Sequence, residues 1–231
     1  MNRRDFDLSA YLVIGPENTL GRPVEDIIEQ AIRAGMSFIQ IRSKEASARQ
    51  LIEWTGRASS VIAKTRPAKV ALVVNDRLDV VLAARDQGIK VDGIHVGQSD
   101  IPVDVCRKYL GEDAIIGLSA RTDQLIEYVQ SVDPSDIDYF GAGPLHETAT
   151  KPDCGLSPTG QVITRSLDEL SELARLSPVP VVVGGGVKAS DLKELAATGV
   201  DGFFVVSAVA GAADPYRAAR ELVTTWQAAK R

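Results

Sequence analysis

Pro180-Val-Val-Val-Gly-Gly-Gly-Val187 and Val200-Asp-Gly-Phe-Phe-Val-Val-Ser-Ala-Val209 are the stretches that decide the fold of this chain. Each is an apolar run ending in small residues, as in a strand buried on both faces of a parallel sheet. The three glycines alone would also fit a tight turn. They equally allow backbone N–H groups to approach a phosphate, and paired phosphate loops after the last two strands recur in (β/α)8 barrels. We therefore predict a barrel whose chemistry lies at the carboxyl ends of its strands.

Upstream of these stretches, short apolar runs alternate with helical patterns. Residues 24–34 carry apolar side chains at helical spacing, between apolar runs at 11–14 and 38–41. Further strands are expected at residues 70–74, 93–96, 114–118 and 137–140. This alternation implies a parallel sheet of eight strand–helix units. We predict an α/β fold, a single (β/α)8 TIM barrel that occupies residues 1–231 as one domain after a polar lead at residues 1–9.

Composition narrows the class of protein. The chain has 231 residues, 45% of them hydrophobic, and a formal net charge of -5 without a basic block, which disfavours nucleic-acid or anionic-membrane partners. Neither an apolar leader nor a membrane-length apolar run is present. Cys106 and Cys154 have no metal-binding or disulfide spacing. We expect a cytoplasmic protein with small-molecule partners, and the sequence is compatible with a homo-oligomer.

A long segment follows the run at 137–140. Residues 141–153 are too long for an ordinary turn between a strand and a helix. A connection of this length is usually functional or disordered. We interpret residues 141–158 as an active-site lid loop. His146 lies within it, and no neighbouring residue marks that imidazole as a catalytic base.

Polar side chains follow several of the expected strands. They are Gln40, Arg42, Lys44, Asn75, Asp76, Gln98, Asp100 and Ser119. Either aspartate alone could simply cap a helix, but Asp76 and Asp100 follow adjacent strands and could together hold Mg²⁺. Arg42, Lys44 and Lys151 could complete an anion cage, although each could also be a solvated surface cation. These residues predict a magnesium-assisted reaction of a diphosphate, with a second phosphate at the glycine loop.

Other chemistries lack support in the sequence. The chain has no Ser-His-Asp order, HExxH, Walker loop or GxGxxG motif, so nucleophilic hydrolysis and dinucleotide binding are disfavoured. His95 lies within an apolar run and is expected to fill the barrel rather than to act as a base.

The motifs resemble those of the thiamine-phosphate synthase family over nearly the whole chain. They are Gln40-Ile-Arg-Ser-Lys44, Asn75-Asp-Arg77, Gly93-Ile-His-Val-Gly-Gln-Ser-Asp100, Gly117-Leu-Ser119, Gly143-Pro-Leu-His-Glu-Thr-Ala-Thr-Lys151, Gly185-Gly186 and Val206-Ser207. The resemblance implies a transferase that joins hydroxymethylpyrimidine diphosphate to hydroxyethylthiazole phosphate and releases diphosphate. It also implies a dissociative mechanism, in which diphosphate leaves before the thiazole nitrogen attacks.

The resemblance implies roles for individual residues. Those implied to bind the pyrimidine diphosphate are Gln40, Ile41, Arg42, Ser43, Lys44, Asn75, Ser119 and Lys151. Those implied to bind the thiazole phosphate are Thr148, Ala149, Thr150, Gly186, Val206 and Ser207. Asp76 and Asp100 would bind Mg²⁺, and the catalytic set would be Arg42, Lys44, Ser119 and Lys151.

The sequence departs from the family pattern at four places. Ser43 stands where Glu is common, Gly184 stands where an apolar residue is usual, and Leu145-His-Glu147 stands where the family often has an aromatic residue and a proline. Residues 85–90 lengthen a connection that we expect to lie at the opposite end of the barrel. Three other functions compete. An aromatizing thiazole tautomerase would not need the diphosphate cage, a non-catalytic sensor or carrier of a thiamine precursor would not need the two aspartates, and a sugar-phosphate isomerase would need a clear acid/base pair.

Overall fold

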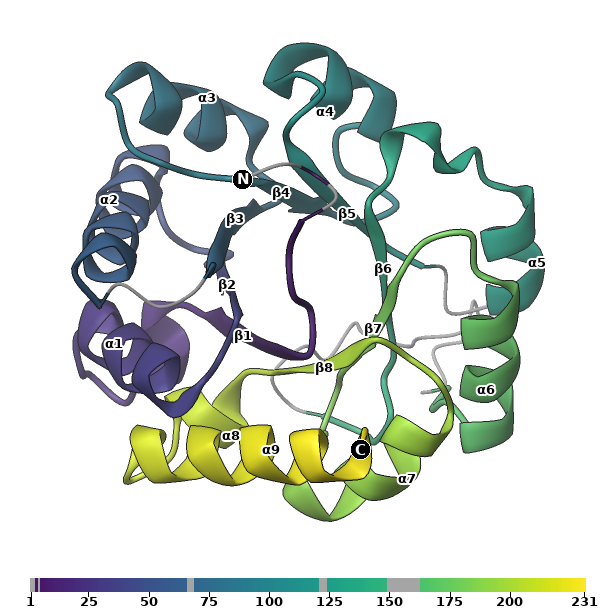
Figure 1. The fold of residues 1–231 in the computed structure, drawn as a ribbon. Helices are drawn as coiled ribbons and strands as arrows, with labels where there is room; N and C mark the ends of the chain where they lie inside the picture. Colours follow the sequence, from purple (N-terminus) through teal and green to yellow (C-terminus); the bar gives the residue numbers. More distant parts are fainter. Residues whose placement is uncertain (1–2, 4, 66–68, 121–123, 149–162) are drawn as a thin grey trace.

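The eight-stranded parallel barrel is present and closed. The structure is a computed structural model that describes residues 3, 5–65, 69–120, 124–148 and 163–231. Its strands pair in chain order, and β1 closes the ring by pairing with β8 (Figure 1). The strands are β1 Ala10–Ile14, β2 Phe38–Ile41, β3 Ala71–Asn75, β4 Gly93–Val96, β5 Ile115–Ser119, β6 Tyr139–Ala142, β7 Val181–Val183 and β8 Gly202–Val205. The predicted (β/α)8 TIM barrel is therefore confirmed.

Helices surround the barrel (Figure 1). They are α1 Val24–Ala34, α2 Ala48–Thr65, α3 Leu78–Asp86, α4 Val103–Leu110, α5 Leu125–Ser131, α6 Leu167–Leu176, α7 Leu192–Ala197, α8 Ser207–Ala210 and α9 Pro215–Ala229. The short 3₁₀ segments are η1 Pro16–Asn18, η2 Pro134–Asp136 and η3 Ala189–Asp191. Local sequence explains their ends: Gly35 stops α1 in the left-handed conformation, and the Asp214 side chain caps α9 by accepting from the Arg217 amide at 2.9 Å.

Two strands differ most from the sequence-based expectation, whereas β1, β3 and β5 are extended or shifted by one residue. We expected a strand at residues 137–140, but β6 begins at Tyr139 because η2 precedes it, and it continues through Gly141 and Ala142, which pair with β7. The run at 200–209 contains β8 only to Val205, and its end is the short helix α8. In both places ladder pairing decides the boundary, whereas the apolar pattern reports only burial.

The core has two layers. Side chains that point outward from the strands pack under the helices, while those that point inward fill the barrel. The inner layer consists of Tyr11, Val13, Phe38, Ala71, Val73, Ile115, Tyr139 and Val182 with neighbouring groups. The barrel is therefore a packed core, and only its ends can hold ligands.

The expectation for residues 85–90 is confirmed. These residues form the end of α3 and the turn into β4, at the amino-terminal end of the strands. The Arg85 side chain holds this connection, since it donates to the Val91 carbonyl at 3.1 Å and to the Leu110 carbonyl at 2.8 Å. The extra residues leave the β3–β4 register intact, with Asn75 opposite His95.

The interior also explains Gly184. A Cβ atom built on Gly184 would lie 2.1 Å from the Phe204 ring, so that ring occupies the space of the apolar side chain expected at position 184. We predict that Gly184→Ala lowers the free energy of unfolding by about 1–3 kcal/mol, the usual cost of overpacking. Adding Phe204→Leu should restore part of that loss in urea titrations. Equal losses with and without Phe204→Leu would contradict this account.

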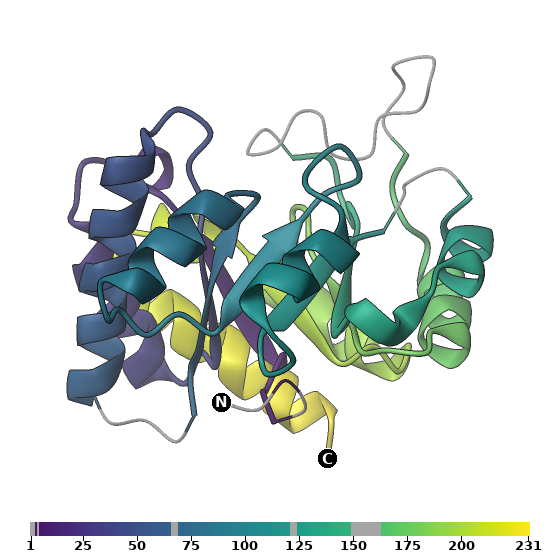
Figure 2. The same cartoon turned by 90° about the horizontal axis from the view of Figure 1, so that it is seen from above.

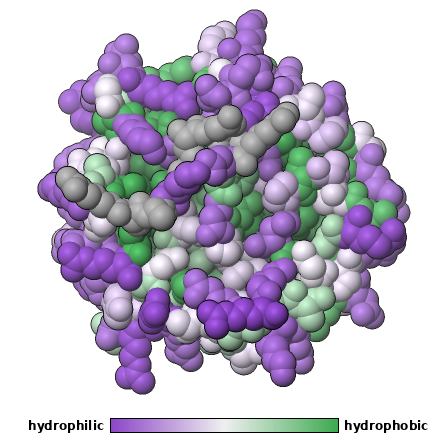
Figure 3. Space-filling view, in the orientation of Figure 1, coloured by the Kyte–Doolittle hydropathy of each residue, from purple (hydrophilic) through white to green (hydrophobic). Residues whose placement is uncertain are grey.

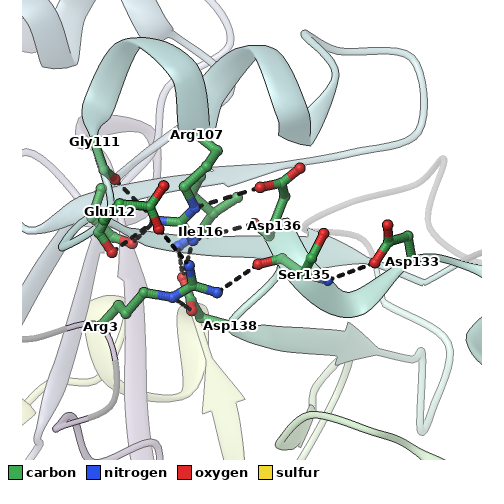
Figure 4. Close-up of polar contacts among 10 residues, drawn as sticks. Arg3, Arg107, Gly111, Glu112, Ile116, Asp133, Ser135, Asp136 and Asp138 are labelled. Carbon is green, nitrogen blue, oxygen red and sulfur yellow. Dashed lines mark hydrogen bonds and ion pairs between the residues drawn. The ribbon is translucent and has the colours of Figure 1, made fainter.

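A buried ion-pair network closes the amino-terminal face (Figure 4). The Asp138 carboxylate accepts from Arg107 Nη2 at 2.7 Å, from Arg3 Nε at 2.7 Å and from the Ile116 amide at 2.8 Å. Arg107 is 5% exposed and Asp138 is 7% exposed. The network joins the amino-terminal segment to α4, β5 and β6. The carboxyl end of the chain lies at this face (Figure 2), and hydrophilic residues predominate around its rim (Figure 3).

Candidate active site

The carboxyl-terminal ends of β2 to β5 bring most of the predicted site residues to one side of the barrel mouth. Arg42 and Lys44 follow β2, Asn75 ends β3 with Asp76 after it, and Ser119 ends β5. Asp100 lies in the loop between β4 and α4. Because parallel strands end at the same edge, residues from four different strands converge there.

The two aspartates are neighbours. Asp76 has a left-handed backbone with φ 61°, a conformation that Asp and Asn tolerate better than most residues. Its amide donates to the His95 carbonyl at 2.8 Å, which ties β3 to β4. Asp100 folds back so that its Oδ2 accepts from the Gly97 amide at 2.7 Å. That loop places the Asp100 carboxylate close enough to Asp76 to raise the pKa of the Asp76 carboxyl.

The Asp76 carboxylate is partly buried and has charged groups close to it. Burial raises its pKa above the ordinary value of 3.8, Lys44 opposes that rise, and the neighbouring Asp100 adds to it. Lys44 Nζ lies 2.7 Å from Asp76 Oδ2, and Asn75 Nδ2 donates to the same oxygen at 2.6 Å. The charged form of Asp76 is therefore less favourable than that of a free aspartate, even with the lysine beside it.

The raised pKa predicts a pH dependence of stability without metal. A carboxyl whose folded pKa exceeds its unfolded pKa loses stability as pH rises through the interval between the two values. Its ionised form therefore costs stability at neutral pH and nothing below the unfolded pKa. We expect Asp76→Asn to raise the melting temperature of the metal-free protein at neutral pH, and the gain to vanish in acid. A lower melting temperature at neutral pH would show that the Lys44 ion pair outweighs burial.

The donor set fits a magnesium ion. Two adjacent carboxylates with an amide beside them form an oxygen-rich site, and Mg²⁺ is usually held by one or two carboxylates, waters and substrate phosphate oxygens. The raised pKa of Asp76 also favours a cation at this position, because a divalent cation would offset the repulsion between the two carboxylates. Across the described part of the chain, no group of three or more His, Cys, Asp or Glu side chains is arranged to bind a metal. The site therefore suits an ion such as Mg²⁺, which needs only one or two ligands from the protein.

Gln40 lies below this cluster, inside the barrel. Its side chain is only 3% exposed, and its Nε2 has no hydrogen-bond partner among the described residues. Leaving a buried amide donor unpaired costs about 1–3 kcal/mol. A ligand that supplies an acceptor above Gln40 would recover that cost, so Gln40 is suited to hold a polar ring.

Glu17 occupies the space beside Ser43. The Ser43 hydroxyl donates to a Glu17 carboxylate oxygen, and the same hydroxyl accepts from the Ala46 amide at 3.0 Å. A carboxylate from the loop after β1 thus stands next to the position where the family commonly has Glu. The sequence did not indicate Glu17, because its partner lies 26 residues away.

His95 points into the barrel and touches Ser119. Its Nε2 lies 3.0 Å from Ser119 Oγ, and its Nδ1 lies 3.0 Å from the Tyr139 hydroxyl. That hydroxyl in turn lies 2.9 Å from the Tyr11 hydroxyl. His95 is a partly buried filling residue, as expected, but it also connects the site to two buried tyrosines that the sequence analysis did not single out.

The glycine loop after β7 forms a second cluster, near β8. Gly185 and Gly186 have φ of 83° and 71°, which favours glycine at both positions. A Cβ on Gly186 would lie 2.9 Å from His146 Cβ. The His146 amide donates to the Gly185 carbonyl at 2.9 Å, so the segment after β6 rests on this loop.

The rest of the second cluster comes from β8 and the segment after β6. Val206 precedes α8, and Ser207 is its first residue. Thr148 is described and half-buried, whereas Ala149, Thr150, Lys151 and the remainder of the expected lid to residue 158 lie outside the described residues. The His146 imidazole lies 3.0 Å from the Asp191 carboxylate.

A cavity of about 670 Å³ lies at the amino-terminal face, where Arg3 and Asp138 form part of its lining. None of the predicted site residues lines this cavity.

Comparison with known proteins gives consistent results. A family model described as thiamine monophosphate synthase matches residues 10–209. A thiamine-phosphate synthase of Corynebacterium efficiens is 38% identical over 218 residues, 94% of each chain. One of Chloroflexus aurantiacus is 39% identical over 216 residues, covering 94% of this chain and 91% of that protein. A solved structure of thiamine phosphate pyrophosphorylase from Pyrococcus furiosus superposes with a TM-score of 0.78 at 27% identity, covering 98% of both chains. A 3-hexulose-6-phosphate synthase from Salmonella typhimurium, at 16% identity and a TM-score of 0.66, shares the fold.

Proposed function

Because the chain belongs to the thiamine monophosphate synthase family, we infer that it is a transferase that joins hydroxymethylpyrimidine diphosphate to hydroxyethylthiazole phosphate. The products are thiamine phosphate and diphosphate. The observation that carries the proposal for the site is the cluster in which Lys44 and Asn75 both contact Asp76, with Asp100 beside it. This cluster combines positive charge and carboxylates, as a magnesium diphosphate requires.

We propose that the pyrimidine diphosphate occupies the β2–β5 side of the mouth. The unpartnered Gln40 amide faces the pyrimidine ring. Arg42 and Ser43 line the approach to it, whereas Ile41, whose side chain is fully buried in the outer core layer, contributes only its backbone. Arg42, Lys44 and Lys151 hold the diphosphate oxygens, Arg42 through its planar fork and the lysines as point charges. Asn75 and Ser119 complete the site through hydrogen bonds.

Asp76 and Asp100 would hold Mg²⁺. When bound, the ion neutralises charge on the diphosphate and makes it a better leaving group. Lys44, which contacts Asp76, is then available to move to a phosphate oxygen. Asp76 stays near its place because its backbone amide is tied to β4.

The thiazole phosphate would occupy the opposite side of the mouth. Its phosphate faces the backbone of Gly186, Val206 and Ser207, and the binding roles implied for Thr148, Ala149 and Thr150 belong to the same ligand. The contact between His146 and the glycine loop supports this arrangement, because it holds that segment over the loop. With the two ligands on facing sides, the thiazole nitrogen meets the pyrimidine methylene.

Chemistry then consists of positioning and electrostatics. Diphosphate departs with the bonding electrons, the resulting pyrimidine-methyl cation is stabilised by its ring amino group, and the thiazole nitrogen attacks that carbon. The residues supply charge to the departing oxygens and hold the acceptor near the reacting carbon. No general base is required, in keeping with a site where the nearest imidazole, His95, is engaged with Ser119 and Tyr139.

An aromatizing tautomerase is the second candidate. It would use the glycine loop but would not need a carboxylate pair with a lysine on it. The close association of Lys44, Asp76 and Asp100 favours the synthase.

We also propose that the chain works in the cytoplasm as one domain, with residues 1–9 as a lead and 141–158 as a lid. No described helix is long and apolar enough to cross a membrane.

The test is a coupled product assay. Purified protein, Mg²⁺ and both precursors should give thiamine phosphate and diphosphate in equal amounts, and omission of Mg²⁺ should abolish both. Asp79→Asn is a matched control, because Asp79 is an exposed aspartate on α3 that forms an ion pair with Arg77. Conversion of a thiazole carboxylate tautomer without diphosphate release would identify a tautomerase instead.

A further inference from the structure

A chain of hydrogen bonds runs through the barrel interior to Ser119. It passes from the Tyr11 hydroxyl to the Tyr139 hydroxyl at 2.9 Å, to His95 Nδ1 at 3.0 Å, and from His95 Nε2 to Ser119 Oγ at 3.0 Å. The residues come from β1, β6, β4 and β5, so no single strand determines the chain. Ser119 stands at its outer end, in the proposed diphosphate site.

The direction of this chain follows from proton counting. Tyr11 is 2% exposed, and aromatic rings of Phe38, Phe204 and Tyr139 lie around its own ring. Among the described residues, Tyr139 is the hydrogen-bond partner of the Tyr11 hydroxyl. If Tyr139 donated to Tyr11, the Tyr11 proton would be buried without an acceptor, which is unfavourable. Tyr11 therefore donates to Tyr139.

The remaining protons are then assigned in turn. Burial raises the pKa of the Tyr11 hydroxyl and of the Tyr139 hydroxyl above the ordinary value for tyrosine. Each phenol therefore keeps its proton. Tyr139 accepts from Tyr11 and donates to His95 Nδ1. A neutral imidazole that accepts at Nδ1 carries its proton on Nε2. That proton points to Ser119 Oγ, and the Ser119 proton is left to point into the site.

We propose that Tyr139 is a positioning residue that fixes His95 as the Nε2–H tautomer and thereby makes Ser119 a hydrogen-bond donor to the substrate. The proposal rests on the proposed function for the identity of the acceptor, an oxygen of the diphosphate. The opposite tautomer would take the Ser119 proton and turn a lone pair toward an anion. Tyr139 thus sets the sign of the Ser119 contact without touching substrate.

The tautomer can be measured independently of activity. The chain has two histidines, so ¹⁵N-histidine spectra of the neutral imidazoles contain two residues, and His146→Asn assigns the signals. We expect His95 to be the Nε2–H tautomer in the wild-type protein and in Tyr11→Phe, which keeps the Tyr139 donor. Tyr139→Phe should abolish that single tautomer. An Nδ1–H tautomer in the wild-type protein, or an unchanged tautomer in Tyr139→Phe, would overturn the proposal even if the protein is an active synthase.

Kinetics test the consequence for Ser119. Tyr139→Phe is expected to lower kcat about 10- to 100-fold, as loss of an outer-shell partner commonly does. KM for the pyrimidine diphosphate should change less than about twofold, because the contact matters most as the diphosphate departs. Tyr109→Phe, which removes an exposed hydroxyl on α4, is the matched control.

A double-mutant cycle separates positioning from packing. In a Ser119→Ala background, Tyr139→Phe should have little further effect on kcat, since the two residues act through one contact. Fully additive losses, or a lower melting temperature with unchanged kcat, would overturn the positioning role. If the product assay fails for the wild-type protein while the tautomer results hold, the proposed reaction is wrong and the hydrogen-bond chain stands.

Discussion

Replacing Asp76 and Asp100 together by asparagine is expected to lower kcat/KM by about a thousandfold or more, because metal-ion stabilisation of a leaving group contributes several kcal/mol. Both carboxylates serve the same cation, so either single variant should cause most of the loss. Asparagine is the better replacement at position 76, since it tolerates the φ of 61° that alanine would strain. The measurement is the Mg²⁺ dependence of the product assay.

Metal binding should be lost in parallel with activity. Calorimetric titration of Mg²⁺ in the presence of inorganic diphosphate should show binding to the wild-type protein and to Asp79→Asn, but not to the double variant. Circular dichroism should show the same fold in all three, since the barrel core does not include these side chains. Full activity of the double variant would rule out the proposed magnesium site.

Asp138→Ala is expected to lower the free energy of unfolding by about 3–5 kcal/mol, the usual cost of stranding a buried charge. Arg107, at 5% exposure, would lose its 2.7 Å partner in the barrel wall, and the Ile116 amide and Arg3 would lose theirs as well (Figure 4). Arg107 would retain uncharged carbonyl partners and only a 3.9 Å approach to the partly exposed Asp136 carboxylate. Urea titration should show a lower midpoint with an unchanged slope.

The same arginine offers a matched control. Asp136 lies 3.9 Å from Arg107 Nε, and its side chain is 31% exposed, so Asp136→Ala should cost about 1 kcal/mol or less. The network lies at the face opposite the site, and Asp138→Ala should keep its kcat where it remains folded. Similar losses for the two variants would show that burial of Asp138 does not set its contribution.

The sequence by itself determined the barrel and the face that carries chemistry. Alternating apolar runs and helical patterns specify parallel strands, and parallel strands that close in chain order must end at one mouth. The residues at or directly after those ends, Arg42, Asp76 and Ser119, are therefore assigned to one mouth of the barrel by the sequence pattern. The paired glycines could be identified because few other residues adopt a positive φ.

Only the tertiary structure decided which of these residues meet, and what supports them. Asp100 reaches Asp76 through a loop that folds back on Gly97, and loop geometry is not encoded in strand periodicity. Strands buried on both faces show no alternation, so the sequence could not tell that Tyr139 points inward toward His95. Arg3 and Asp138 are 135 residues apart, and long-range pairs of this kind are set by how the chain closes, which local pattern does not report.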